Sequence, residues 1–189
     1  MIVKHIHPAK RIVSLTAVIF FMLYGNSLYT QIIKTPEEFL KEEFPGASIQ
    51  RRSVYIAKED LADLEKIAGE KFQGRLFAFH AAAIKGTISG YAVFDTHRVR
   101  TKEETLCIVF TPEGNIRKVQ LISFYEPEDY IPSVRWLKQF LNRKDADSVT
   151  SDNIAGITGA TLTTQAVMGT VRKSMVVFQY GILKNRKVK

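Results

Sequence analysis

Eleven consecutive residues near the C-terminal end carry most of the chemistry that this chain could perform, and they read Ala155-Gly156-Ile157-Thr158-Gly159-Ala160-Thr161-Leu162-Thr163-Thr164-Gln165. Two glycines let the backbone turn tightly and let a ligand approach it closely. Thr161 falls where an apolar helix begins. Because a helix start has unpaired N–H groups and the positive end of the helix dipole, the segment suits a phosphate group. The hydroxyls of Thr163 and Thr164 are candidate additional donors.

Local sequence alone also allows Thr161 to be an ordinary helix N-cap after a glycine turn. A more specific interpretation comes from Thr158-Gly159-Ala160-Thr161, followed by Leu162-Thr163-Thr164 and an apolar helix, which resembles the (Ser/Thr)-Gly-Ala-Thr signature of the FMN-binding domain family. That family includes flavinylated components of the sodium-translocating NADH:quinone oxidoreductase and of the Rnf complex. In the family, the last threonine of the signature carries FMN through a phosphoester bond, which an FMN transferase installs outside the cytoplasm.

The resemblance implies FMN as the cofactor and Thr161 as its attachment point. It also implies that the neighbouring residues of the segment contact the cofactor, namely Thr158, Gly159, Ala160, Leu162, Thr163 and Thr164. One position departs from the family pattern, since Ala155 stands where an Asp usually precedes the flavinylated threonine by six residues. This departure favours one alternative, an exported non-redox binding or scaffold module that has lost flavinylation. Another alternative is an enzyme that holds FMN without a covalent bond.

The flavin ring needs an apolar wall with a few polar groups, and the aromatic segment 124–136 is the best candidate for it. In the family, the segment after the corresponding strand approaches the flavin. The resemblance therefore implies Tyr125, Glu126 and Trp136 as neighbours of the ring. A single tryptophan on a short helix is also typical of a core residue, so the core alternative stays open for Trp136.

Other ionisable residues give weaker indications. His97 has no companions with the spacing of a metal-ligand set, so we predict no metal site. Arg98, Arg100 and Lys102 are interpreted as the solvated side of a strand, with the docking of an anionic redox partner as the alternative. A lone Cys107, expected to be buried, excludes an internal disulfide and the Cys-x-x-Cys motifs of redox pairs and haem attachment. Any redox role therefore needs a bound cofactor.

The elements that must position these residues follow from the apolar patterns. Helices are predicted to run from Thr35-Pro36 to about residue 44, over 58–68, after Pro132 and over 162–178. Between residues 75 and 124, β-branched and aromatic residues broken by glycines indicate antiparallel strands, with a hairpin that joins 106–110 to 116–124. We therefore expect an α+β fold, a twisted antiparallel sheet flanked by helices, in which the Thr161 helix closes the flavin site.

The N-terminus has the three-part pattern of a secretory signal. Lys4, Lys10 and Arg11 form a basic start, 12–24 is a run of thirteen uncharged residues, and 25–27 are small or polar. The run is shorter than the ~20 residues of a spanning helix, which favours cleavage over a retained anchor. The predicted division is 1–27 as signal peptide or membrane anchor, 28–74 as an N-terminal helical extension and 75–189 as the FMN-binding domain.

These features predict an exported protein, in the periplasm or on the outer face of the cytoplasmic membrane. The net charge of +8 and the basic C-terminal tail suit nucleic acid or anionic lipid, but export removes the nucleic acid. No GxGxxG turn is present, so electrons are expected from membrane-bound or exported redox proteins. The expected function is electron carriage by FMN linked to Thr161. Such a chain is a shuttle rather than a self-contained enzyme, has no catalytic residues of its own, and needs an FMN transferase as a partner.

Overall fold

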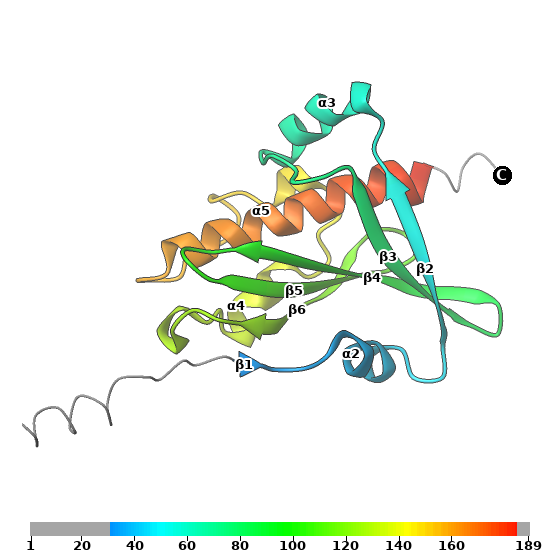
Figure 1. Ribbon diagram of the computed structural model, residues 1–189, viewed down its shortest axis with the longest axis horizontal. Helices are drawn as coiled ribbons and strands as arrows, with labels where there is room; N and C mark the ends of the chain where they lie inside the picture. Colours follow the sequence, from blue (N-terminus) through cyan, green and yellow to red (C-terminus); the bar gives the residue numbers. More distant parts are fainter. Residues whose placement is uncertain (1–30, 185–189) are drawn as a thin grey trace, which may run out of the picture.

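The strand-rich region of the sequence builds most of an antiparallel sheet in the computed structural model, which describes residues 31–184. The sheet has the strand order β1-β6-β5-β4-β3-β2, and Figure 1 shows the strand direction turning across it, as in a twisted sheet. Its strands are β1 Gln31–Ile32, β2 Ser48–Tyr55, β3 Leu76–Ile84, β4 Thr87–Arg98, β5 Glu103–Phe110 and β6 Ile116–Phe124. The predicted α+β class is confirmed, whereas the predicted signal or anchor over 1–27 lies outside the described residues.

Strand β5 shows how the sheet separates two hydrophobic cores. Because side chains alternate between the faces of a strand, Leu106 and Ile108 join the core beneath helix α5, while Cys107 and Val109 join the core beneath helix α2. Cys107 is fully buried, as predicted. The predicted β5–β6 hairpin is also confirmed, and Gly114 in its turn has a φ of 93°, which favours glycine.

The two predicted N-terminal helices are confirmed. Helix α2 spans Pro36–Glu43 and begins with a capping box between Thr35 and Glu38. Helix α3 spans Lys58–Ala68 and ends at Gly69, whose φ of 67° lies in the left-handed region. Glu65 on this helix is buried, and its carboxylate accepts the Phe72 N–H and pairs with Lys71 Nζ at 2.6 Å.

A strand that was not predicted lies between these two helices. Strand β2 pairs with β3 in antiparallel register along all eight of its residues. Only Val54 of this edge strand is buried, so its sequence lacks the apolar alternation that predicts a strand. The described part of this segment, 31–74, is therefore more than the predicted helical extension, because it contributes strands β1 and β2 to the same sheet. The predicted division at residue 75 does not coincide with a break in that sheet.

Helix α5, Thr161–Phe178, lies across the face of the sheet opposite to α2 (Figure 1). Its predicted apolar stripe is confirmed, since Val167, Val171, Met175 and Phe178 are at most 1% exposed. The short helix α4, Val134–Leu137, is capped by Ser133, and one-turn helices cover Glu128–Tyr130, Lys138–Phe140 and Ala146–Ser148. A π-helical turn, Gln179–Leu183, follows α5. No helix within residues 31–184 is long and apolar enough to cross a membrane.

Candidate functional site

A tight turn, residues 157–160, directly precedes α5. The N–H of Ala160 donates to the carbonyl of Ile157 at 3.0 Å, which closes a four-residue β-turn. Gly159 occupies the third position of this turn with a φ of 79°, and type II turns need a glycine there because other residues rarely adopt a positive φ. The glycine of the family signature therefore has a conformational role at the start of the site.

The hydroxyl of Thr164 ties this turn to the helix. Thr164 Oγ1 accepts the N–H of Ile157 at 3.0 Å and donates to the carbonyl of Ala160 at 3.2 Å. Its hydrogen is therefore already engaged within the protein. We interpret Thr164 as a residue that holds the loop in shape, rather than as the phosphate donor that the sequence suggested.

Thr161 is the first residue of α5, and the N-cap position belongs to Ala160, whose side chain makes no capping bond. The ordinary N-cap interpretation of Thr161 is therefore wrong. The first helical bond runs from the Thr164 N–H to the Ala160 carbonyl at 3.0 Å. Within residues 31–184, the N–H groups of Thr161, Leu162 and Thr163 have no acceptor. No acidic residue lies in this first turn, so its positive end is not neutralised locally.

These N–H groups belong to the wall of a recess of about 280 Å³. Its lining consists of Gly159, Ala160, Thr161, Leu162 and Thr163 from the start of α5, with Arg100 and Tyr130 from elsewhere in the chain. Five of the predicted cofactor contacts are thereby brought together. Thr161 is an exposed residue of this lining.

Sequence reasoning missed two residues of this recess, Arg100 and Tyr130. Arg100 lies at the tip of the β4–β5 hairpin, and its guanidinium carbon sits 5.2 Å from the ring centroid of Tyr130. Arg98, Arg100 and Lys102 are all exposed, as predicted, but only Arg100 lines the recess. The one signal in the sequence was the run of basic residues in this hairpin, and nothing in its spacing distinguishes Arg100 from its neighbours.

The other predicted contacts, Thr158, Thr164, Tyr125, Glu126 and Trp136, do not line the recess. Trp136 is buried, and its indole N–H donates to the carbonyl of Ala155 at 2.5 Å, in agreement with the core alternative. Glu126 is buried and directs its carboxylate at the tip of the β4–β5 hairpin. Tyr125 is half-buried at the end of β6, and its contact with a flavin ring stays a prediction.

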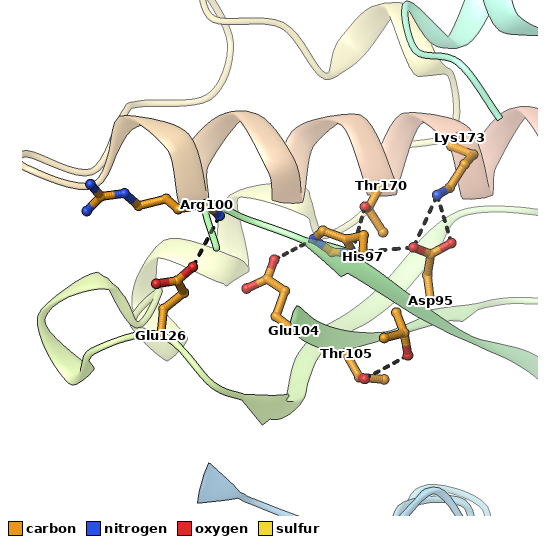
Figure 2. Close-up of polar contacts among 9 residues, drawn as sticks. Asp95, His97, Arg100, Glu104, Thr105, Glu126, Thr170 and Lys173 are labelled. Atoms are coloured by element: carbon orange, nitrogen blue, oxygen red, sulfur yellow. Dashed lines mark hydrogen bonds and ion pairs between the residues drawn. The ribbon is translucent and has the colours of Figure 1, made fainter. Parts of the chain in front are cut away.

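A second polar cluster lies beneath the middle of α5 and consists of Asp95, His97, Glu104, Thr170 and Lys173 (Figure 2). His97 Nε2 is 2.6 Å from Glu104 Oε1, and Lys173 Nζ is 2.9 Å from Asp95 Oδ2. Burial alone lowers the pKa of His97, but hydrogen bonds to Asp95 and Glu104, and the charges of both, raise it to about 9.

The cluster is distinct from the recess. Figure 2 shows the Arg100 side chain extending away from it, toward the beginning of α5. Across residues 31–184, no group of three or more His, Cys, Asp or Glu side chains is arranged to hold a metal ion. His97 is therefore best described as a buried imidazolium that is paired with two carboxylates.

Fold and site together define an α+β domain with a recess of unpaired N–H donors at the start of a long helix. The sequence model of the FMN-binding domain family matches residues 81–176, more than half of the chain, and the chain belongs to this family. A crystal structure of Shewanella oneidensis NqrC shares 15% sequence identity, covers 92% of this chain and 94% of that chain, and has a TM-score of 0.46. No match is found among curated proteins. The assignment rests on the family match.

FMN is the cofactor of this family, and the recess fits the phosphate end of that molecule. A phosphate carries negative charge and several acceptor oxygens. The recess is lined by Thr161, Leu162 and Thr163, whose N–H groups have no acceptor within residues 31–184, and by the positively charged Arg100. The exposed Thr161 hydroxyl lies in the same recess, where a phosphoester bond could form.

Proposed function

We propose that this chain is an exported electron-transfer protein that carries FMN on Thr161 through a phosphoester bond. The observation that carries the proposal is the position of Thr161. Thr161 is exposed, is not the N-cap residue of α5, and lines a recess together with backbone donors and Arg100. The chain that carries it is a member of the FMN-binding domain family. When bound, FMN supplies the ability to accept and pass on electrons, which none of the side chains in the recess can do.

The protein's own residues bind and orient the cofactor. The N–H groups of Thr161, Leu162 and Thr163 stabilise the phosphate, and the ester to Thr161 Oγ1 prevents its loss. Leu162, which is 48% exposed, and Tyr130 supply apolar surface beside the recess. Since the recess lies at the protein surface, electrons can be exchanged with other proteins. The proposed partners are an FMN transferase and membrane-bound or exported redox proteins.

The attachment is tested by coexpression with an FMN transferase, followed by intact-mass measurement. Wild-type chain should gain the mass of one FMN moiety, and Thr161→Ala should not. Thr158→Ala is the matched control, because Thr158 is an exposed threonine of the same turn and does not line the recess. An FMN-sized increment that persists in Thr161→Ala would place the bond at another residue.

A visible spectrum of the protein purified from its native envelope separates the proposal from its two alternatives. Yellow colour that survives denaturation indicates covalent carriage. Colour that is released on denaturation indicates non-covalent FMN, as in an enzyme with a loosely bound cofactor. Colourless protein indicates the scaffold alternative, for which Ala155 is the sequence evidence.

Export is tested separately, with reporters fused to the C-terminus. The basic start and uncharged run of residues 1–24 predict a reporter that is active outside the cytoplasm. A reporter that works only in the cytoplasm would contradict export and would also remove the access of an exported transferase to Thr161.

A further inference from the structure

The tip of the β4–β5 hairpin is held by a single carboxylate. Glu126 Oε1 accepts the N–H groups of Arg100 at 3.3 Å, Thr101 at 2.6 Å and Lys102 at 2.7 Å. Figure 2 shows the contact with Arg100. The Thr101 hydroxyl adds a fourth contact at 3.3 Å. Hairpin tips are usually mobile because few contacts fix them. Here three successive backbone donors converge on one buried oxygen, so the conformation of residues 100–102 is set by Glu126.

A single oxygen of the Glu126 carboxylate, Oε1, makes all of these contacts. Burial raises the pKa of Glu126, but hydrogen bonds from the backbone of Lys102, Thr101 and Arg100 outweigh burial and hold the pKa below its ordinary value. The group is therefore ionised near neutral pH. An ionised carboxylate repels a phosphate and does not line the recess, so its role there is to hold other groups in place.

The same short segment also fixes the Arg100 side chain. Tyr130, four residues after Glu126, places its ring beneath the Arg100 guanidinium, 5.2 Å from ring centroid to guanidinium carbon. A guanidinium stacked on an aromatic face keeps its N–H groups free at the edge, where they can bind an anion. Both Arg100 and Tyr130 line the recess with Thr161.

We propose that Arg100 is the residue that makes this site select a phosphorylated flavin over an unphosphorylated one, and that Glu126 and Tyr130 are its positioning residues. The inference rests on the proposed function, since it assigns the phosphate of FMN to the Thr161 recess. The neutral N–H groups of α5 bind an anion weakly by themselves, while a charged donor at a fixed position adds a stronger bond. Glu126 acts through Arg100 because it fixes the backbone that carries the side chain.

The test compares FMN with riboflavin, which lacks the phosphate. Wild-type chain made without an FMN transferase is titrated with each flavin, and binding is followed by the quenching of flavin fluorescence. Wild type should bind FMN more tightly than riboflavin. Arg100→Ala should weaken FMN binding roughly ten- to a hundredfold, the range for a charge-assisted hydrogen bond, and leave riboflavin binding nearly unchanged. Arg98→Ala, an exposed arginine of the same hairpin outside the recess, is the matched control and should retain the preference.

The positioning role of Glu126 is tested by a double-mutant cycle. Glu126→Gln should lower the preference for FMN by less than Arg100→Ala does, and should add no further loss when the two changes are combined. A merely structural role would weaken both flavins equally and add its effect to that of Arg100→Ala.

The outcomes separate this inference from the function on which it rests. If wild type binds neither flavin, or binds both equally, this inference fails, while the intact-mass comparison of wild type with Thr161→Ala still decides the proposed function. If wild type prefers FMN and Arg100→Ala keeps that preference, or if Arg98→Ala loses as much, only the inference is overturned.

Discussion

The first turn of α5 and its middle differ in how their polar groups are partnered. At the first turn, the N–H groups of residues 161–163 lack acceptors within the described chain, and Thr161 is exposed beside a recess. In the middle, Thr170 and Lys173 meet His97 and Asp95 in a buried cluster. Donors left without internal partners can bind a ligand, whereas buried paired charges stabilise one arrangement of the fold.

Because of this difference, we expect substitutions in the two regions to have opposite effects on flavin attachment and on the free energy of unfolding. Changes at the first turn should alter flavin attachment while the free energy of unfolding changes little. Changes at the buried cluster should alter the free energy of unfolding while the flavin content of each folded molecule stays the same. Substitutions in the two regions therefore test whether the two roles are separate.

Removing His97 should cause the largest loss of stability. Glu104 is fully buried, its Oε1 pairs with His97, and its Oε2 has no hydrogen-bond partner within residues 31–184. His97→Ala therefore leaves an uncompensated buried carboxylate and should lower the free energy of unfolding by about 3–5 kcal/mol in urea titrations. Thr96→Ala is the control, since Thr96 is exposed and only shares a hydroxyl bond with Thr105. Equal losses in the two variants would contradict the assigned role of the buried cluster.

The same histidine should make stability depend on pH in a defined range. The pKa of His97 is raised from 6.5 to about 9 in the folded protein, so its stabilising contribution is complete below pH 6.5 and is lost as the pH rises through about 9. Between these values the free energy of unfolding should fall by up to about 1.4 kcal/mol per pH unit. Urea titrations at several pH values measure this slope.

His80 should not obscure that measurement. Burial lowers the pKa of His80, so its own effect on stability lies below pH 6.5. The slope above pH 6.5 should therefore disappear in His97→Ala and persist in His80→Ala. A slope that is unchanged in His97→Ala would show that another group titrates there.

Thr164→Val should have a smaller effect on stability and a clear effect on attachment. The substitution removes the hydroxyl that bonds Ile157 and Ala160, and it should lower the free energy of unfolding by about 1–2 kcal/mol. Because the turn before Thr161 is then less fixed, the rate of FMN attachment should fall, as followed by in-gel flavin fluorescence. Thr158→Val, in the same turn, should attach FMN at the wild-type rate. Attachment in Thr164→Val as fast as in Thr158→Val would argue against a role for turn geometry.

Ala155→Asp should have the smallest effect on stability and tests the departure from the family pattern. The Ala155 backbone bonds Gln139 Oε1 and Trp136 Nε1, while the residue is exposed, so the free energy of unfolding should change by less than about 0.5 kcal/mol. If the transferase recognises an acid at this position, Ala155→Asp should be labelled faster than wild type under limiting enzyme. Faster labelling of wild type in a fluorescence time course would refute that idea.

Much of the local structure was determined by the sequence itself. The apolar spacing of Val167, Val171 and Met175 predicted helix α5, and the turn residues between 111 and 115 predicted the β5–β6 hairpin. The glycine turn before Thr161 was also predicted, because a position with positive φ is usually occupied by glycine. These features depend on neighbours in the chain, so a local pattern contains the information.

Residues that are far apart in the sequence come together only in the folded protein. Strand β2 is held mainly by backbone bonds to β3, and backbone groups are the same in every residue, so its exposed sequence gave no indication of a strand. In the same way, Arg100 lines the same recess as Thr161 because Glu126 and Tyr130 hold a hairpin tip that is remote from α5 in the sequence. The role of Thr161 could be predicted from the residues around it in the chain. The position of Arg100 in the same recess depends on strand pairing, which the local sequence does not encode.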